Sequence, residues 1–418
     1  MRMTMTETLD RRTVWGLTLA GASLIAACYG LARFSYGLFV PVFRTEFDFG
    51  AAAAGALASG SYAAYCAAII AATLLTPRFG GRAIAVAAGA TATIGTLAIA
   101  VAPNTLVLAL GVIVAGASTG VASPPLAHAV ARSVDTARQS RVQTVINAGT
   151  GLGVAIAGPI ALLTHDQWRA AWIAFAALSA AVTLWTVFAV PRTVDSREAG
   201  DGAPARVLVP RPLFPAESPR LVWAALLLGA ASAAVWTFGR DLLVSAGGMS
   251  ETASTICWIL LGALGIIGAI GGDLVGALGL RATWMITVTV LALSTVTVAI
   301  APTSVAAAGI ALGAFGAAYI AASGLLLLWG TRVYDAHPAA GVGLGFLVLA
   351  LGQTLAAPAL GGIGDLIGLR WAFAAAAGVG LFGALACAPR VTPSPGASSA
   401  ARPGASRTPD PESPARRA

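Results

Sequence analysis

The sequence predicts an all-α membrane protein whose twelve transmembrane helices form two pseudo-symmetric six-helix bundles. Three observations lead to this fold class: a low charge content, a regular series of apolar segments, and sequence matches between the two halves of the chain. An apolar run of about 20 residues crosses a bilayer as a helix, and internal repeats are a feature of many membrane proteins with paired bundles.

The composition excludes a soluble globular domain. Only 10% of the residues are charged and 57% are hydrophobic, with a mean hydropathy of +0.83, whereas about a quarter of a soluble domain is charged. A folded chain of 418 residues with so few polar groups could not cover its surface in water, but a bilayer accepts an apolar exterior. We therefore expect an integral membrane protein.

Twelve apolar segments lie between charged residues and Pro, Gly or Asn breaks, each near the length that crosses the hydrocarbon core. The first segment is too long for the core of a signal peptide, so we expect it to remain as a span. The predicted spans are residues 16–42, 51–75, 83–102, 105–128, 142–164, 169–190, 220–243, 252–275, 282–301, 304–329, 339–361 and 371–388.

The arginines predict the orientation, because cytoplasmic loops carry an excess of basic residues. With both termini in the cytoplasm, 20 of the 25 basic residues, all arginine, lie in the terminal segments and the cytoplasmic loops. The other five lie within spans or on the outer side: Arg33, Arg44, Arg169, Arg240 and Arg370. We therefore expect both termini to be cytoplasmic.

Shifts in composition divide the chain into five parts. Residues 191–219 are Pro-rich with mixed charge, and we expect a cytoplasmic linker; residues 390–418 are rich in Pro, Ser, Ala and Arg, and we expect a disordered cytoplasmic tail. The remaining parts are a cytoplasmic N-terminus (1–13), an N-terminal six-helix bundle (14–190) and a C-terminal six-helix bundle (220–389).

The two halves carry four matches in the same order, at offsets of about 200 residues. Such duplication is typical of transporters whose substrate path runs between the halves. The matched segments are 34–37 with 236–239, 74–82 with 273–281, Arg132-x-x-Asp135 with Arg332-x-x-Asp335, and 168–172 with 369–373.

The turn between the second and third spans resembles the signature G-x-L-A-D-R-x-G-R-R of the major facilitator superfamily. The first copy keeps Leu75, Arg78, Gly80 and Arg82, and the second keeps Gly272, Leu274, Gly279 and Arg281. Pro77 and Gly276 stand at the acidic position, which in the family helps to hold the outward-facing state; Asp135 or Asp273 is a candidate substitute. The resemblance covers residues 14–389 and implies a bacterial twelve-helix secondary transporter of the cytoplasmic (inner) membrane.

The fifth span is similar to the Gly-rich motif of proton-coupled exporters in that family. It contains Gly149, Gly151 and Gly153, followed by Gly158-Pro159. Glycines let helices approach closely and proline introduces a kink. This resemblance implies export, with Gly158 and Pro159 as gating residues; the alternative is ordinary close packing in a chain with 49 glycines.

Arg33 lies inside the apolar first span, where an arginine costs ~2.5–3.5 kcal/mol on insertion scales. Tyr29, Arg33 and Tyr36 are spaced to share one face of an α-helix, with Phe34 off that face. We interpret these three as substrate-binding residues, Arg33 contacting an anionic or polar solute or tuning a nearby acid. The alternative is that Arg33 snorkels outward or braces the bundle.

Arg240 and Asp241 form the other charged pair within a span. Adjacent helical residues point about 100° apart, so the two need not pair with each other. Asp241 is the best candidate for a proton acceptor, with Arg240 beside it in a coupling role; the alternative for Asp241 is a charge at the outer end of the helix. Aligning Phe34 with Trp236 places Val235 opposite Arg33, so the buried charges are not duplicated.

Other candidates are uncharged or lie at the cytoplasmic rim. Asn147, Trp236 and Gln353 are candidate substrate contacts, although amides also join helices to each other. Tyr62, Tyr65 and Trp258 either line an aromatic cavity or pack. The gating candidates at the rim are Arg78, Gly80, Arg82, Arg132, Asp135, Arg281, Arg332 and Asp335.

No motif points to an enzyme. The chain has no nucleotide-binding loop, nucleophile elbow, metal-binding spacing or paired cysteines, so we expect no cofactor, no metal and no ATP-driven pumping by this chain alone. Its pI of about 10.0 arises from arginines near the membrane, which gives no reason to expect nucleic-acid binding. The expected partners are the lipid bilayer, a small-molecule substrate and a coupling proton, with the chain acting as a monomer.

These features predict a secondary active transporter that moves a small organic solute by alternating access, in the form of proton-coupled export of a drug or metabolite. Two alternatives stay open. One is import or uniport of a small organic solute, for which Arg33 makes an anion one option; the scarcity of carboxylates within the spans favours uniport. The other is a non-transporting membrane sensor built on a transporter fold.

Overall fold

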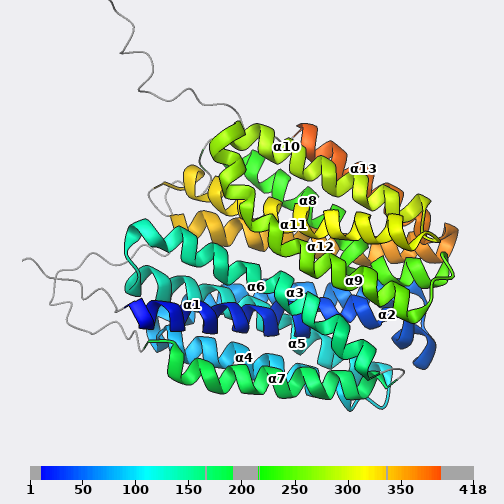
Figure 1. The fold of residues 1–418 in the computed structure, drawn as a ribbon, viewed down its shortest axis with the longest axis horizontal. Coiled ribbons are helices and arrows are strands. Elements are labelled where there is room, and N and C mark those ends of the chain that lie inside the picture. The colour runs from blue at the N-terminus through cyan, green and yellow to red at the C-terminus, as the bar shows by residue number, and fades with distance from the viewer. Residues whose placement is uncertain (1–10, 165–166, 192–214, 216, 336–337, 387–418) are drawn as a thin grey trace, which may run out of the picture.

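The computed structural model describes residues 11–164, 167–191, 215, 217–335 and 338–386 (Figure 1). The predicted linker falls mostly outside these residues. The predicted tail falls wholly outside them, and so does most of the predicted N-terminal segment.

The first half of the chain is helical from residue 11 onward. Helices suit a bilayer because every backbone hydrogen bond is made within the segment. The elements are α1 (Arg11–Ile25), a π-helical segment η1 (Ala26–Phe34), α2 (Ser35–Glu46), α3 (Ala51–Phe79), α4 (Gly81–Ala100), α5 (Thr105–Ser133), α6 (Thr136–Leu163) and α7 (Trp168–Ala189).

The second half repeats this order of helices. Its elements are α8 (Ser218–Ser245), α9 (Glu251–Gly265), a 3₁₀ segment η2 (Ile266–Ile270), α10 (Gly271–Ile300), α11 (Val305–Val333), α12 (Pro338–Ile367) and α13 (Leu369–Ala386). Matching caps begin α5 and α11: the side chain of Asn104 accepts a hydrogen bond from Val107 N, and that of Ser304 accepts one from Ala307 N.

Each of the twelve predicted spans corresponds to helical structure. Ten segments of the described chain are long and apolar enough to cross a membrane, and Leu369–Leu385 is a shorter apolar helix. One of the ten, Glu251–Ile300, contains two predicted spans, because the backbone turns at Gly279 with φ +79°. Gly80 makes the corresponding turn in the first half with φ +84°. Both signature glycines therefore occupy a conformation that side chains disfavour.

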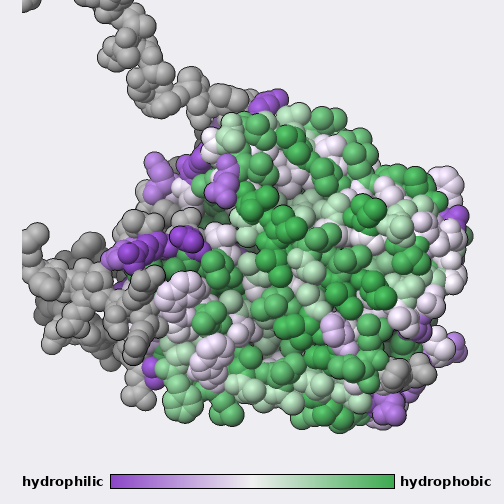
Figure 2. Space-filling view, in the orientation of Figure 1, coloured by the Kyte–Doolittle hydropathy of each residue, from purple (hydrophilic) through white to green (hydrophobic). Residues whose placement is uncertain are grey.

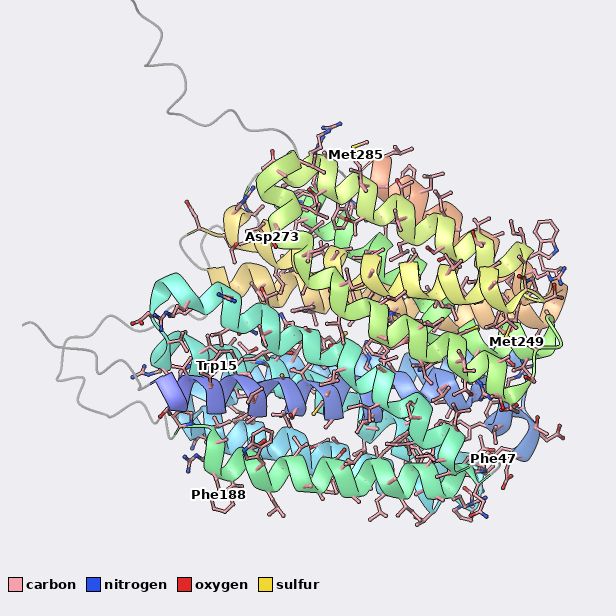
Figure 3. All side chains as sticks on the ribbon, in the orientation of Figure 1. Trp15, Phe47, Phe188, Met249, Asp273 and Met285 are labelled. Carbon is pink, nitrogen blue, oxygen red and sulfur yellow. The ribbon has the colours of Figure 1, made fainter. Side chains whose placement is uncertain are left out.

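The helices run nearly parallel, with the first half on one side of the molecule and the second half on the other (Figure 1). Apolar residues cover the middle of the visible face, and hydrophilic residues gather at its two ends (Figure 2). We call the end where α1 begins, near Trp15 and Phe188, the terminal end, and the opposite end, near Phe47 and Met249, the distal end (Figure 3).

In the described residues, the most extensive contacts between the halves are those of α2 with α8, α3 with α12, and α6 with α9. Since α3 is equivalent to α9 and α6 to α12 in the repeat, the last two contacts are related by the pseudo-symmetry. The interface between the halves is therefore built from the same surfaces used twice.

Candidate functional site

Equivalent residues of the two halves meet at the centre of the interface. The rings of Phe34 and Trp236 stack with centroids 3.8 Å apart. One turn further, Arg240 Nη1 donates a hydrogen bond to the carbonyl oxygen of Leu38 at 2.6 Å. Both pairs are related by the sequence alignment of the halves, so α2 and α8 lie against each other along the pseudo-two-fold axis.

The π-helical segment η1 corrects the predicted helical face. In a π-helix the hydrogen bonds run from residue i to i+5, so Tyr29 and Phe34 share a face, with ring centroids 6.3 Å apart. Phe34 therefore lies in the cluster around Arg33, and its predicted exclusion from that face was wrong. Tyr36 lies apart from the cluster, its hydroxyl donating to Ala54 O at 2.9 Å.

Arg33 is buried at the interface, with 5% of its surface exposed. Its Nη2 donates to Gln353 Oε1 of α12 at 2.6 Å, and Gln353 Nε2 donates to Ser232 Oγ of α8 at 3.3 Å. Four aromatic rings surround the guanidinium carbon: Tyr62 and Tyr65 with centroids at 4.7 Å, Phe34 at 5.1 Å and Tyr29 at 6.0 Å. We call Arg33, Gln353 and these four aromatic residues the Arg33 cluster.

A second group of rings, from α8, α9 and α11, extends this cluster into the second half. Trp236 makes edge contacts with Trp258, Phe315 and Tyr319, with centroid separations from 5.2 to 6.1 Å. The hydroxyls of Tyr62 and Thr237 are 3.2 Å apart, which adds a polar contact between the halves. The buried nitrogens Arg33 Nε, Trp236 Nε1 and Trp258 Nε1 have no hydrogen-bond partner among the described residues.

Most of the predicted substrate-binding residues converge on this cluster. Tyr29, Arg33, Trp236 and Gln353 lie together, whereas Asn147 is half-buried in α6 and is not among the contacts of Arg33. Sequence reasoning missed Tyr319 and Ser232, which carry no charge or motif and are identified only by packing. Tyr62, Tyr65 and Trp258, named as possible cavity aromatics, belong to the site or touch it.

Arg240 and Asp241 bind separate partners, in agreement with their predicted independence. Asp241 pairs with Arg44 of α2 across the interface. Arg240 pairs with Glu251 of its own half and donates from Nε to Ser254 Oγ at 3.1 Å. Because Asp241 is only 3% exposed, it is a buried interface carboxylate and not an exposed charge at a helix end.

A carboxylate of the second half caps a helix of the first half at the distal end. Asp365 Oδ1 accepts a hydrogen bond from Ala51 N at 2.7 Å, and Oδ2 accepts one from Ala52 N at 2.8 Å. These are unpaired N–H groups of the first turn of α3, where a negative charge is also favoured by the helix dipole. The sequence analysis did not single out Asp365.

Replacing Asp365 with alanine should loosen the distal end without unfolding α3. Loss of a helix cap costs about 0.5–2 kcal/mol, and this cap exists only while α12 contacts α3. We therefore expect the distal end to open about 2- to 30-fold more often. The readout is the thiol reactivity of Ala51→Cys in a background without native cysteines. The matched control is Asp48→Asn, which removes an exposed carboxylate that precedes α3 and keeps a residue type that tolerates the positive φ of this position; equal reactivity of the two variants would contradict the role of the cap.

The glycines of α6 allow this helix to pack closely on both sides. A Cβ atom at Gly149 or Gly153 would meet the carbonyl oxygens of Ala22 and Ala26 at 2.2 Å, on the first span. At Gly151 and Gly158 it would meet Gly262 O at 2.8 Å and the Ile259 side chain at 2.1 Å, on α9. Alternate glycines thus face the two halves, which is suitable for a helix at a moving interface.

Gly37 is a position where α2 lies in close contact with α8. A Cβ atom there would lie 2.1 Å from Trp236 O, a backbone atom that cannot move aside alone. Gly37→Ala should therefore separate the halves at the distal end and raise the reactivity of Ala51→Cys. Gly16→Ala, where nothing lies within 4 Å, is the control on the same span. If Gly37→Ala leaves the thiol as protected as the control does, the contact is not tight in the protein.

The predicted gating residues of the signature turns and rim lie at the terminal end. Arg82 Nε donates to Val190 O at 2.5 Å, and Arg78 lies 5.4 Å from the ring of Phe79. The structure leaves the remaining rim residues exposed, near the ends of α5 and α11 and just after the Gly279 turn of α10: Arg132, Asp135, Arg281, Arg332 and Asp335. Asp273, a predicted substitute for the missing signature acid, is exposed at the same end (Figure 3). The gating roles stay predictions.

The profile of the Major Facilitator Superfamily matches residues 22–353. The chain belongs to the major facilitator superfamily. It is therefore a multi-pass membrane secondary transporter of a small solute and not an enzyme.

Solved structures of other superfamily members share the fold. A bacterial homologue of the human lysosomal transporter Spinster, in an inward-facing and unoccupied conformation, matches with a TM-score of 0.71 and 15% identity, covering 91% of this chain and 97% of that one. The nucleoside transporter NupG matches with a TM-score of 0.68 and 14% identity, covering 90% of this chain and 98% of that one. No curated protein matches the sequence. At these identities the similarity concerns the fold alone.

Proposed function

We propose that this superfamily member exports a small organic solute across the cytoplasmic membrane by alternating access, with the Arg33 cluster as its substrate site. One observation carries the proposal: a buried arginine near the middle of a span is held by Gln353 of the opposite half. Charged groups within a bilayer are retained mainly where they serve a pathway. A site made from both halves must also come apart when the halves separate.

The contacts between the halves support a state that is closed at the distal end. They run from Arg33–Gln353 near the middle of the membrane, through Ser59 Oγ to Thr354 O at 2.7 Å, to Asp365 on the first turn of α3. With the termini in the cytoplasm, as the arginine distribution predicts, this state is closed to the outside. Opening the distal end requires all of these contacts to break.

The export direction and the coupling rest on separate observations. The two-sided glycines of α6 support the resemblance to exporters. Asp241 is the favoured proton acceptor, because its partner Arg44 lies on the other half and leaves when the distal end opens. A carboxylate that loses its cation on opening would then take up a proton from the distal side. Uniport is the second candidate, since Asp241 and its charged neighbours are already paired in the closed state.

A cysteine pair offers a test that works before the solute has been identified. A Cβ atom at Gly364 would lie 3.4 Å from that of Ala51, close to the separation in disulfides. Proteoliposomes containing Ala51→Cys/Gly364→Cys, without native cysteines, are loaded with bacterial cytosolic extract, and released solutes are measured by mass spectrometry. We expect solute release by the reduced protein only, because the disulfide locks the distal end.

The same assay separates the alternatives. Release that requires a proton gradient, and loses that requirement in Asp241→Asn, supports coupled export, whereas gradient-independent release supports uniport. Absence of release by the reduced pair and by the wild type, or unchanged release after oxidation, would contradict transport through this interface.

A further inference from the structure

We infer that the solute is a small organic anion, a carboxylate on a flat aromatic body, bound by Arg33, with the indole N–H of Trp236 as a further donor. This inference rests on the proposed function of the Arg33 cluster and adds the chemical class of its substrate. Three features of the cluster carry it: its charge, its hydrogen-bonding groups and its walls.

The first feature is an uncompensated positive charge. In the described part of the chain, the buried Arg240 pairs with Glu251, and Arg44 pairs with Asp241. Arg33 is equally buried, but its partners are a neutral amide oxygen and four rings. A cation in an apolar site requires a counter-charge to be stable there. Since the described residues supply none, an anionic solute can supply it.

The second feature is an excess of donors. Arg33 Nε and Trp236 Nε1 are buried without an acceptor in the part of the chain that the structure describes, and neither side chain can accept a hydrogen bond itself. Gln353 Oε1 occupies only Nη2 of the guanidinium. A carboxylate brings two oxygens that match the planar fork of an arginine. Gln353 thus acts as a neutral stand-in that holds Arg33 while no anion is bound.

Two tyrosine hydroxyls of the cluster are already hydrogen-bonded and add no demand for polar groups on the solute. Tyr29 hydroxyl is bonded to Ser123 Oγ at 2.9 Å, and Tyr62 hydroxyl to Thr237 Oγ1 at 3.2 Å. What these residues present to the site is therefore mainly their ring surface. A sugar or another polyhydroxy solute would find few free hydrogen-bond partners at these hydroxyls. A single carboxylate needs only the free donors of Arg33 and Trp236.

The third feature is a set of flat walls. Phe34 stacks on Trp236, and Phe315 stacks on Tyr319 with an interplanar angle of 9°. Aromatic rings prefer stacked or edge contacts with other rings. A planar aromatic body that separates Phe34 from Trp236 would replace one stacking contact by two. A cationic amphiphile would instead meet the unneutralised charge of Arg33.

Charge also bears on direction. The interior of a bacterial cell is electrically negative, so the membrane potential drives an anion outward. The membrane potential therefore favours export of an anion whether or not a proton is coupled to it. In the release assay described above, we therefore expect more solute to leave the loaded proteoliposomes when their interior is made electrically negative.

The test measures binding of small probes to the full-length protein in detergent micelles. The readout is the quenching of tryptophan fluorescence. The probes are four aromatic carboxylates (benzoate, phenylacetate, indole-3-acetate and 4-hydroxybenzoate), with benzamide and benzylamine as neutral and cationic analogues. We expect saturable binding of at least one carboxylate, at least tenfold tighter than of both analogues. Binding should weaken at least tenfold in Arg33→Gln and less in Arg33→Lys, which retains the charge, while the exposed Arg370→Gln binds as the wild type does.

Three outcomes would overturn the inference. They are no binding of any of the carboxylates, equal binding of benzamide or benzylamine, and unchanged carboxylate binding in Arg33→Gln. If Arg33→Gln does not fold, Arg33→Lys and the comparison of probes on the wild type still decide it. If only neutral or cationic solutes are released in the release assay, the solute is not an anion but the proposed transport function holds. If no solute is released at all, the proposed function itself is wrong.

Discussion

Replacing Arg33 with alanine is expected to abolish solute exchange while leaving the protein as stable as the wild type, or more so. The two effects have one cause. The guanidinium is buried without a counter-charge, which costs ~2.5–3.5 kcal/mol on insertion scales. Removing it relieves that cost, offset by the lost bond to Gln353. Transport falls because a buried hydrogen-bonded charge pair with a ligand is worth about 2–5 kcal/mol, which is roughly 30- to several-thousandfold in affinity.

The measurement pairs exchange in proteoliposomes with thermal unfolding in detergent. The control is Arg370→Ala, which removes an exposed arginine whose Nη2 donates to Ala246 O at 3.3 Å. It should alter neither quantity by much. If Arg33→Ala instead unfolds the protein or lowers its melting temperature by many degrees, Arg33 is a structural brace, as the alternative interpretation of the sequence holds. Near-wild-type exchange would remove Arg33 from the site.

The arginines that departed from the positive-inside rule are the ones that lie at structurally important positions. Five arginines did not fit the cytoplasmic segments, and the structure gives each a specific partner. Arg169, for example, pairs with Glu46 at 2.8 Å and donates to Ala102 O at 3.1 Å. An arginine far from the cytoplasmic side is unfavourable for insertion, so a local partner or a function must stabilise it.

Periodicity predicted the spans well but gave the wrong face for the first one. A strict period of 3.6 residues placed Tyr36 beside Arg33 and excluded Phe34, because a local switch to π-helical hydrogen bonding leaves no mark in hydropathy. Partners distant in sequence were equally invisible. Gln353 lies 320 positions from Arg33, and Asp365 lies 314 positions from Ala51; a single sequence carries no signal that joins them.

The duplication was the most informative sequence signal for the site. The match between residues 34–37 and 236–239 indicated equivalence, and the structure brings the equivalent rings of Phe34 and Trp236 into contact on the axis. Residues on a symmetry axis can meet their own counterparts, which the alignment alone did not indicate. The charged residues that have no charged equivalent in the other half, Arg33, Arg240 and Asp241, then mark where the two halves differ, and all three lie at the interface.

Removing the charge of Arg44 and removing the charge of Asp241 should open the distal end to different extents, although the two residues form one ion pair. The Asp241 side chain is 4% exposed and that of Arg44 is 26% exposed. In Arg44→Gln, the closed state retains a buried carboxylate without its cation, a change that costs about 3–5 kcal/mol. In Asp241→Asn, Arg44 can turn toward water, and we expect a cost of about 1 kcal/mol, as for a solvated ion pair. The distal end of Arg44→Gln should therefore open roughly a hundredfold or more above the wild type, and that of Asp241→Asn about fivefold.

The reactivity of Ala51→Cys measures both variants, and the exchanged pair Arg44→Asp/Asp241→Arg provides the decisive comparison. The swap keeps one charge of each sign but puts the arginine at the more buried position, beside Arg240. If the pair acts only as a link between the halves, the swap should restore protection of the thiol. If the order of charges also matters for proton uptake at Asp241, the swap should restore protection but not gradient-dependent release. Equal effects of the two single substitutions would contradict the unequal burial from which the prediction follows.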